Sequence, residues 1–282
     1  MTQKKKVWLI ALFMFWLGYE VKDNRVFPLS HFYKRHFVDH PEPKKTKSQQ
    51  QYAVYADINA RKRVDCPAPQ NAEVVVTFGQ SNAANSGGHR YTNQDSRILN
   101  FFDGHCYVAS DPMLGASADR GSLWIPFAQA YKSDKTLVFV TFAVGATRLD
   151  QWADPDDLGK HFKHNMSSLK QAGLSPDLFL WVQGESDHAS DVSVYERSLD
   201  EYLSGIATEF PESRLALSGT SYCASNSSKA LVRAQRKVAQ NRDFIWLGVT
   251  DDIVGSEYRY DNCHFSKYGM DKVAKRFAES LK

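Results

Sequence analysis

The sequence predicts an α/β fold, namely a doubly wound, flavodoxin-like parallel sheet of about five strands with helices on both faces. Two observations point to this class. After Cys66, short runs rich in β-branched and aromatic residues alternate with longer stretches whose apolar residues recur at helical spacing. The strand-like runs are also apolar almost throughout, as expected where helices cover both faces of a sheet.

Strands and helices are expected in alternation from residue 73 to the C-terminus. The predicted strands are 73–78 (EVVVTF), 97–102 (RILNFF), 136–143 (TLVFVTFA), 177–182 (DLFLWV), 214–218 and 244–249. The predicted helices lie near 121–132, 157–172, 193–210, 229–241 and 266–281. This order builds βαβ units, whose strands run parallel to one another.

The N-terminus carries the pattern of an export signal. Three lysines, Lys4 to Lys6, precede an apolar run at 7–18. No small-x-small cleavage site follows, so residues 1–22 are expected to be an uncleaved signal anchor, or else a signal peptide. The run is shorter than the roughly 20 residues that span a bilayer comfortably. A buried helix of the soluble domain is the alternative.

Residues 23–70 are predicted to form a basic stalk or linker, because prolines, a lysine cluster and a glutamine run replace any sustained periodicity there. Residues 71–282 then form the folded domain. The lysines before the apolar run place that domain on the non-cytoplasmic side, periplasmic or extracellular, either tethered to the membrane or secreted.

The charge distribution gives no reason to expect a nucleic-acid partner. The net charge is only +3. Residues 1–65 carry 13 Lys and Arg against 6 Asp and Glu, so the rest of the chain is slightly acidic. An acidic body does not favour binding to a phosphate backbone.

Four cysteines suit an oxidising compartment. Of the three pairings that four cysteines allow, we expect Cys66–Cys106 and Cys223–Cys263. The first two flank the first pair of predicted strands, Cys223 follows a later strand, and Cys263 lies near the C-terminus. Four reduced thiols are the alternative. No Cys-x-x-Cys spacing indicates a metal site, and we expect no metal or organic cofactor.

Two polar segments at the ends of the chain contain a nucleophile and a possible base for it. Ser81 lies in GQSNAAN, directly after the first predicted strand, where its hydroxyl can face the crevice at the carboxyl ends of the strands. Asp261 and His264 share the segment DNCHF, in which the carboxylate can orient the imidazole toward a serine. Alternatively, each of these residues merely caps a helix.

Two further segments offer hydrogen-bond donors for a developing oxyanion. Gly145 follows the strand at 136–143, and its backbone N–H is unobstructed by a side chain. Gln183, in WVQGESD, follows the strand at 177–182 and carries a side-chain amide. Arg148 and Trp152 could line a sugar site, although packing of Trp152 in the core is an equal alternative.

Taken together, GQSNAAN, the Gly145 segment, WVQGESD and DNCHF resemble the sequence blocks of SGNH hydrolases. Within these they are most similar to the sialate O-acetylesterase-like group, which includes carbohydrate esterase family six. The resemblance covers about 73–282. It departs from the family pattern at Ala83, where Met is common, and at Ala146, where Gly is frequent. Both changes would reshape the acyl pocket rather than the chemistry.

The resemblance implies an SGNH hydrolase fold and a role for each block. Ser81 would be the nucleophile, His264 the general base and acid, and Asp261 its orienting partner. The oxyanion hole would consist of the backbone N–H groups of Ser81 and Gly145 and the side chain of Gln183. Candidate substrate-binding residues are Asn82, Arg148 and Glu185.

The function expected from these residues is a serine-dependent O-acetylesterase that removes acetyl groups from carbohydrate, a polysaccharide or a sialic-acid-type glycan, through an acetyl-enzyme intermediate. The alternatives are a lipid ester or thioester hydrolase, a carbohydrate O-acetyltransferase of the same fold, and a non-catalytic, membrane-tethered glycan-binding protein.

Overall fold

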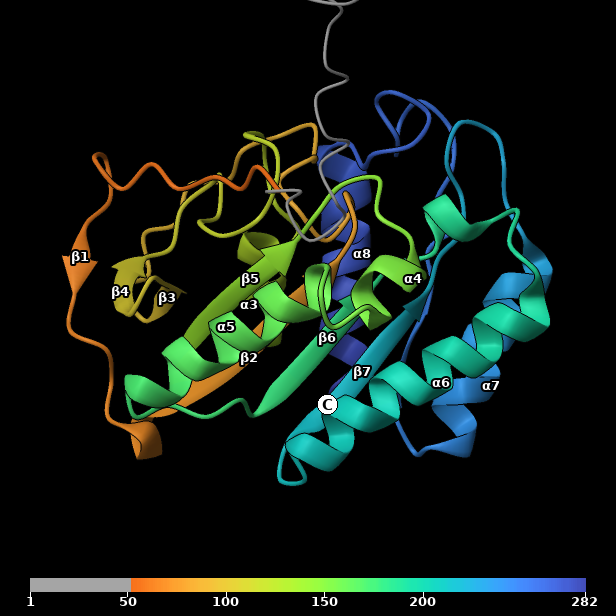
Figure 1. Cartoon of the computed structure of the whole chain (residues 1–282). Helices are drawn as coiled ribbons and strands as arrows, with labels where there is room; N and C mark the ends of the chain where they lie inside the picture. The colour runs from red at the N-terminus through yellow and green to blue at the C-terminus, as the bar shows by residue number, and fades with distance from the viewer. Residues whose placement is uncertain (1–51) are drawn as a thin grey trace, which may run out of the picture. The chain divides into compact units, whose positions relative to one another are not determined.

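A computed structural model describes residues 52–282, in which eight strands form one sheet (Figure 1). The strands lie in the order β1-β4-β3-β5-β2-β6-β7-β8. Their bounds are β1 Arg63–Val64, β2 Ala72–Gly79, β3 Ile98–Phe102, β4 His105–Val108, β5 Thr136–Ala143, β6 Leu178–Val182, β7 Arg214–Gly219 and β8 Ile245–Val249.

Along this order, each strand from β3 onward pairs in parallel with the next, which confirms the predicted class. The prediction of about five strands was too low, because six strands pair in parallel and β4 and β1 extend one edge of the sheet with antiparallel pairs. β4 returns from β3 through a turn at Asp103 and Gly104, both with positive φ. Its four residues and the two of β1 are too short to show a periodicity in the sequence.

Helices cover both faces of the sheet. Their bounds are α3 Trp124–Tyr131, α4 Leu149–Ala153, α5 Leu158–Gln171, α6 Val192–Glu209, α7 Lys229–Asn241 and α8 Lys267–Ser280. One core cluster joins the sheet to α4, α5, α6 and α7, and a second joins it to α3 and α8. Figure 1 shows the same division, with α5 and α6 in front of the sheet and α3 and α8 behind it.

Strand β2 shows why its sequence is apolar throughout. Val74, Val76 and Phe78 belong to the first cluster and Val75 to the second, so successive side chains enter opposite cores.

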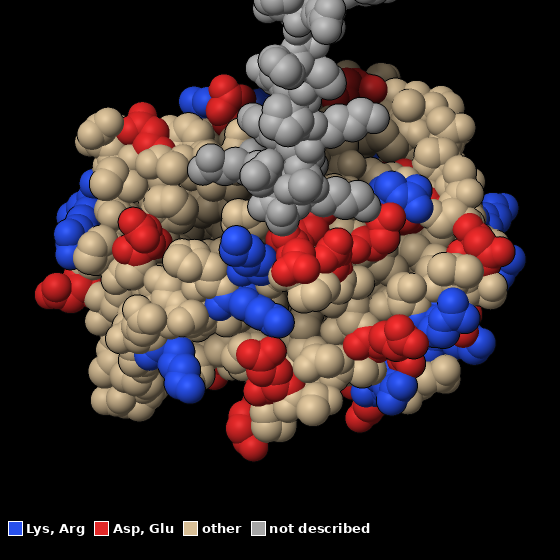
Figure 2. All heavy atoms as spheres, viewed as in Figure 1, with Lys and Arg blue, Asp and Glu red and all other residues tan. Residues whose placement is uncertain are grey.

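On the outer surface of α6 and α7, Lys237 and Arg242 form salt bridges with acidic residues of α6. Figure 2 shows acidic and basic side chains interspersed over the face that is in view there.

The folded unit begins earlier than the sequence suggested. The sequence predicts a linker over residues 52–70, but β1 lies within this segment and pairs with β4. A disulfide joins Cys66 to Cys106, and the Tyr52 hydroxyl donates to Asp157 Oδ1 over 2.6 Å. The predicted signal anchor and most of the predicted stalk lie outside the described residues. Within 52–282, no helix is long and apolar enough to cross a membrane.

The register of the sheet brings three chain segments to one edge. Gly79, at the end of β2, pairs with Ala143 at the end of β5 and with Val182 at the end of β6. Gly79 has a φ of +131°, and a Cβ there would lie 2.0 Å from the carbonyl oxygen of Val182. Glycine is therefore required for β2 to turn so close to β6. The segments that contain Ser81, Gly145 and Gln183 leave the sheet at this edge.

Candidate active site

Ser81 lies in the turn that follows β2. The side chain of Gln80 fixes this turn, because its Oε1 accepts hydrogen bonds from the backbone N–H groups of Gly184 and Ser186 over 3.3 and 3.1 Å. Ser81 keeps 7% of its surface exposed. Its backbone N–H donates to no group within residues 52–282, so it is free to bind a ligand oxygen.

Asp261 and His264 lie on the loop between β8 and α8. Nδ1 of His264 is 2.7 Å from Oδ2 of Asp261, and Oδ1 of Asp261 accepts the backbone N–H groups of His264 and Cys263. Asn262 between them adopts a left-handed φ of 64°. Desolvation raises the pKa of Asp261, but the hydrogen bonds from His264 outweigh it, and the pKa lies below its ordinary value. The carboxylate is therefore held ionised against the imidazole.

The loop of Ser81 and the loop of His264 lie side by side. Asn82, next to Ser81, is 3.5 Å from the carbonyl oxygen of Cys263, next to His264. The backbone N–H of Gly88 donates to the carbonyl of Phe265 over 2.8 Å. Two chain segments almost 180 positions apart thus meet above the sheet edge.

A disulfide and a buried arginine hold the loop of His264. Cys223, after β7, is bonded to Cys263, and the pairs Cys66–Cys106 and Cys223–Cys263 are those expected from the sequence. Arg259 is 1% exposed and donates to the carbonyl oxygens of Cys263, Thr250 and Ile253. It therefore joins the loop to the end of β8. No pattern in the sequence indicates this role for Arg259, because an arginine in a polar loop is normally solvated.

Gly145 lies beside Ser81. A Cβ on Gly145 would be 3.5 Å from Cβ of Ser81. Its backbone N–H donates to the hydroxyl of Ser117 over 2.8 Å, so Ser117 also borders the site. Ser117 lies in the long connection between β4 and α3, which has no periodicity, and the sequence contains no signal that would have identified it.

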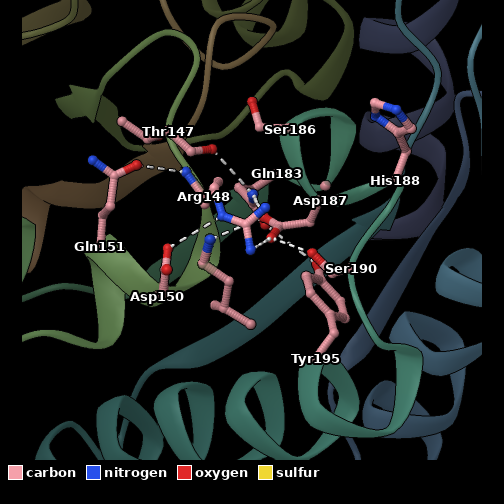
Figure 3. A network of polar contacts seen from close by, with 12 residues as sticks. Thr147, Arg148, Asp150, Gln151, Gln183, Ser186, Asp187, His188, Ser190 and Tyr195 are labelled. Atoms are coloured by element: carbon pink, nitrogen blue, oxygen red, sulfur yellow. Dashed lines mark hydrogen bonds and ion pairs between the residues drawn. The ribbon is translucent and has the colours of Figure 1, made fainter.

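Gln183 does not reach the crevice. It has no exposed surface, and its Nε2 donates to Asp187 Oδ2 over 2.5 Å and to the carbonyl of Thr147 over 3.2 Å. Its Oε1 accepts the hydroxyl of Tyr195 over 3.2 Å. Figure 3 shows the amide enclosed by these partners. Its contacts do not support the expected role as an oxyanion donor, and it instead connects β6 to α6.

The three candidate substrate-binding residues differ in their surroundings. Asn82 and Glu185 are 6% and 2% exposed, and Asn82 Nδ2 donates to Glu185 Oε1 over 2.7 Å. This hydrogen bond fixes the two side chains relative to each other inside the protein. Desolvation raises the pKa of Glu185, and the hydrogen bond from Asn82 only partly opposes it. Arg148 is half exposed and 3.5 Å from Asp187 (Figure 3), so only this residue of the three is open to a ligand.

Trp152 lies in the core, not at the surface. It is fully buried, and its ring packs edge-on against Phe142 and Trp181. Its indole N–H donates to Thr147 Oγ1. A stacking role toward a sugar is therefore excluded. Within residues 52–282, no cluster of three or more His, Cys, Asp or Glu side chains could hold a metal ion.

Residues 71–282 match the protein family described as "Carbohydrate esterase, sialic acid-specific acetylesterase". No curated protein matches the sequence. A solved protein of Arabidopsis thaliana shares 17% sequence identity and a TM-score of 0.61, and the match covers 75% of this chain and 98% of that one.

Two bacterial structures are also similar. A Parabacteroides merdae protein described as a GDSL-like lipase has 13% identity and a TM-score of 0.53 over 76% of this chain and 98% of its own. A Slackia heliotrinireducens protein described as an SGNH hydrolase has 17% identity and a TM-score of 0.50 over 75% of this chain and 100% of its own. At such identities the likeness concerns the fold, which is that of the SGNH hydrolases.

Proposed function

The chain belongs to the carbohydrate esterase family of sialic acid-specific acetylesterases, and on this basis we propose that it is a serine-dependent O-acetylesterase acting on acetylated carbohydrate. Family membership makes it a carboxylic ester hydrolase. The proposal adds the nucleophile, the proton carrier and the class of ester.

In the proposed mechanism, Ser81 Oγ attacks the acetyl carbonyl carbon while Nε2 of His264 takes the hydroxyl proton. Asp261 accepts the hydrogen bond from Nδ1–H and stabilises the imidazolium that forms. When the tetrahedral intermediate collapses, the sugar oxygen leaves with the proton from His264, and the acetyl group stays on Ser81. A water molecule, deprotonated by His264, then releases acetate and restores the serine.

The observation that carries this proposal is the meeting of the two loops. Gly88 and Phe265 share a backbone hydrogen bond, and Asn82 reaches the carbonyl of Cys263. Ser81 and His264 are the immediate chain neighbours of Asn82 and Cys263, so the contact between the two loops brings these residues near each other and supports a reaction between their side chains. The free N–H of Ser81 supports an oxyanion hole beside the nucleophile, where negative charge would develop. Gly145 lies next to Ser81, although its N–H donates to the Ser117 hydroxyl.

The family supports acetylated carbohydrate as the substrate, either a polysaccharide or a sialic-acid-type glycan. The decisive experiment measures acetate release from O-acetylated glycans by the wild type and by Ser81→Ala. We expect the variant to lose activity by at least about 1000-fold, because a residual rate comes only from binding and the oxyanion hole. Ser167→Ala, an exposed serine on α5, is the matched control and should behave as the wild type. Undiminished turnover by Ser81→Ala would refute the mechanism.

The same assay separates the alternatives. Preference for longer acyl chains or thioesters would indicate a lipid ester or thioester hydrolase, and transfer of acetyl to an added sugar would indicate an acetyltransferase. Glycan binding without acetate release would indicate a non-catalytic binding protein.

The two disulfides indicate a protein of the non-cytoplasmic, secreted type. We extend this to a periplasmic or extracellular location with tethering through residues 7–18, which is supported by the sequence pattern of that segment alone. Fractionation of cells that produce the full chain, with and without the Lys4–Lys6 cluster, tests this assignment.

A further inference from the structure

The N–H group of Gly145 already has a partner. It donates to the Ser117 hydroxyl over 2.8 Å, so its hydrogen does not point freely into the site. A Cβ built on Gly145 would be 3.5 Å from both Ser117 Oγ and Ser81 Cβ. The Ser117 hydroxyl and the Ser81 side chain therefore both border the space that a side chain on Gly145 would occupy, on the side where Gly145 was expected to bind the oxyanion.

The Ser117 hydroxyl is free to donate a hydrogen bond. Its oxygen accepts from Gly145, and its O–H donates to no group within residues 52–282. The residue is partly exposed, so the proton can reach a ligand in the crevice. A hydroxyl that accepts one hydrogen bond becomes a stronger donor in the next, because hydrogen bonds in a chain polarise one another.

The segment that carries Ser117 is fixed by the same turn that carries Ser81. Asn85 is fully buried, and its side chain donates to the carbonyl oxygens of Met113 and Ala116 and accepts the N–H of Met113. The backbone N–H of Asn85 donates to the carbonyl of Ser117, whose own N–H donates to Ala143 at the end of β5. Ser117 is therefore held in place before substrate binds, as electrostatic stabilisation of a transition state requires.

We propose that Ser117 is a catalytic residue whose hydroxyl accepts a hydrogen bond from Gly145 N–H and donates a hydrogen bond to the carbonyl oxygen of the acyl group under attack. This inference rests on the proposed function. Ser117 would supply the side-chain donor of the oxyanion hole, the role for which Gln183 is too deeply enclosed. The donors would then be Ser81 N–H directly and Gly145 N–H through the Ser117 hydroxyl.

The test compares Ser117→Ala and Ser117→Thr with the wild type and with Ser167→Ala. Steady-state hydrolysis of an acetyl ester gives kcat and KM. In parallel, intact-mass spectrometry follows the rate at which a small phosphonyl fluoride labels Ser81, since its P=O group occupies the same hole. We expect Ser117→Ala to lower kcat and the labelling rate at least about tenfold, with KM within about twofold, because the negative charge on this oxygen develops on the way to the tetrahedral intermediate and is absent from bound substrate. Ser117→Thr keeps the hydroxyl and should retain both rates within about threefold of the wild type.

Each other outcome has a definite reading. If Ser117→Ala keeps or raises kcat and the labelling rate, the hydroxyl only blocks Gly145, and the inference is wrong while the proposed function stands. Equal losses in the alanine and threonine variants would attribute the effect to the shape of the loop and would also overturn it. A wild-type chain that reacts with neither reagent at Ser81 would overturn the proposed function itself, and this inference with it.

Discussion

The side-chain amide of Asn82 donates to Oε1 of Glu185 over 2.7 Å, and both groups are buried beside the nucleophile. The second carboxyl oxygen of Glu185, Oε2, has no hydrogen-bond partner among the described residues. Desolvation dominates and raises the pKa of Glu185 above its ordinary value of 4.5. The turn that carries Ser81 is thus held through Asn82 by a carboxyl group whose charged form is disfavoured by burial.

This predicts that Glu185→Gln increases the free energy of unfolding, relative to the wild type, by a larger amount as the pH rises. A raised pKa in the folded state means that the contribution of Glu185 to stability is fully present below 4.5 and is lost as the pH rises through the folded value. Glutamine keeps an acceptor for Asn82 and removes the ionisable group. Urea unfolding at pH 4.5, 6 and 8 should show the free-energy difference, variant minus wild type, growing with pH. A difference that shrinks with pH would contradict this, and Glu209→Gln, at the exposed end of α6, is the control.

Asp261→Asn should lower kcat by about 100- to 10 000-fold, because the amide no longer orients and stabilises the imidazolium. The contribution of Asp261 to stability should depend on pH in the opposite sense to that of Glu185. The pKa of Asp261 is lowered, so the wild type gains stability above pH 3.8 and loses it as the pH falls through the folded value. The variant should therefore be less stable than the wild type at pH 7, with the gap closing below pH 3.8. Asp200→Asn, on α6, is the control and should leave kcat unchanged.

The two disulfides provide a matched comparison, since each joins residues 40 positions apart. On the loop-entropy account, removing either should cost a similar free energy of unfolding, about 2–5 kcal/mol. Only Cys263 lies on the loop of Asp261 and His264. We expect Cys223→Ala/Cys263→Ala to lower kcat at least about tenfold, because geometry is part of catalysis, and Cys66→Ala/Cys106→Ala to keep it. Chemical denaturation and ester hydrolysis measure the two effects separately. Equal kcat in both double variants would show that the bridge does not position the loop.

Gly145→Ala and Gly79→Ala should separate activity from stability. At Gly145 a Cβ meets Ser81 and Ser117 only at ordinary contact distance, 3.5 Å, so the fold should tolerate it within about 1 kcal/mol. The methyl group nevertheless enters the space between those two serines, and kcat/KM should fall. At Gly79 the Cβ would lie 2.0 Å from the Val182 carbonyl at a positive φ. That variant should unfold at a clearly lower temperature. Thermal unfolding and kcat/KM are the measurements. A strongly destabilised Gly145→Ala would contradict the inference that a methyl group fits between Ser81 and Ser117.

The central elements could be predicted because each has one uninterrupted periodicity. β5 has the predicted bounds, 136–143, and α7 has the predicted bounds, 229–241. The five-residue α4 and the two-residue β1 were missed, since both are too short to show a pattern and depend on contacts formed elsewhere. The linker boundary was placed too late for the same reason.

Within the candidate site, sequence reasoning succeeded where position follows from topology. Residues directly after parallel strands reach one edge of the sheet, and this placed Ser81 near Gly145. The orientation of Gln183 could not be predicted, because it depends on Asp187 and on Tyr195 from the following helix. Ser117 and Arg259 act through tertiary contacts that no local pattern encodes.

The attachment of residues 52–70 has a practical consequence for protein production. A fragment cut at residue 71, where the family match begins, would lack Cys66 and leave Cys106 as an unpaired thiol. It would also expose the backbone of β4 as an open sheet edge, a template for aggregation. Recombinant versions that start before Tyr52 should avoid both liabilities and yield a monodisperse sample.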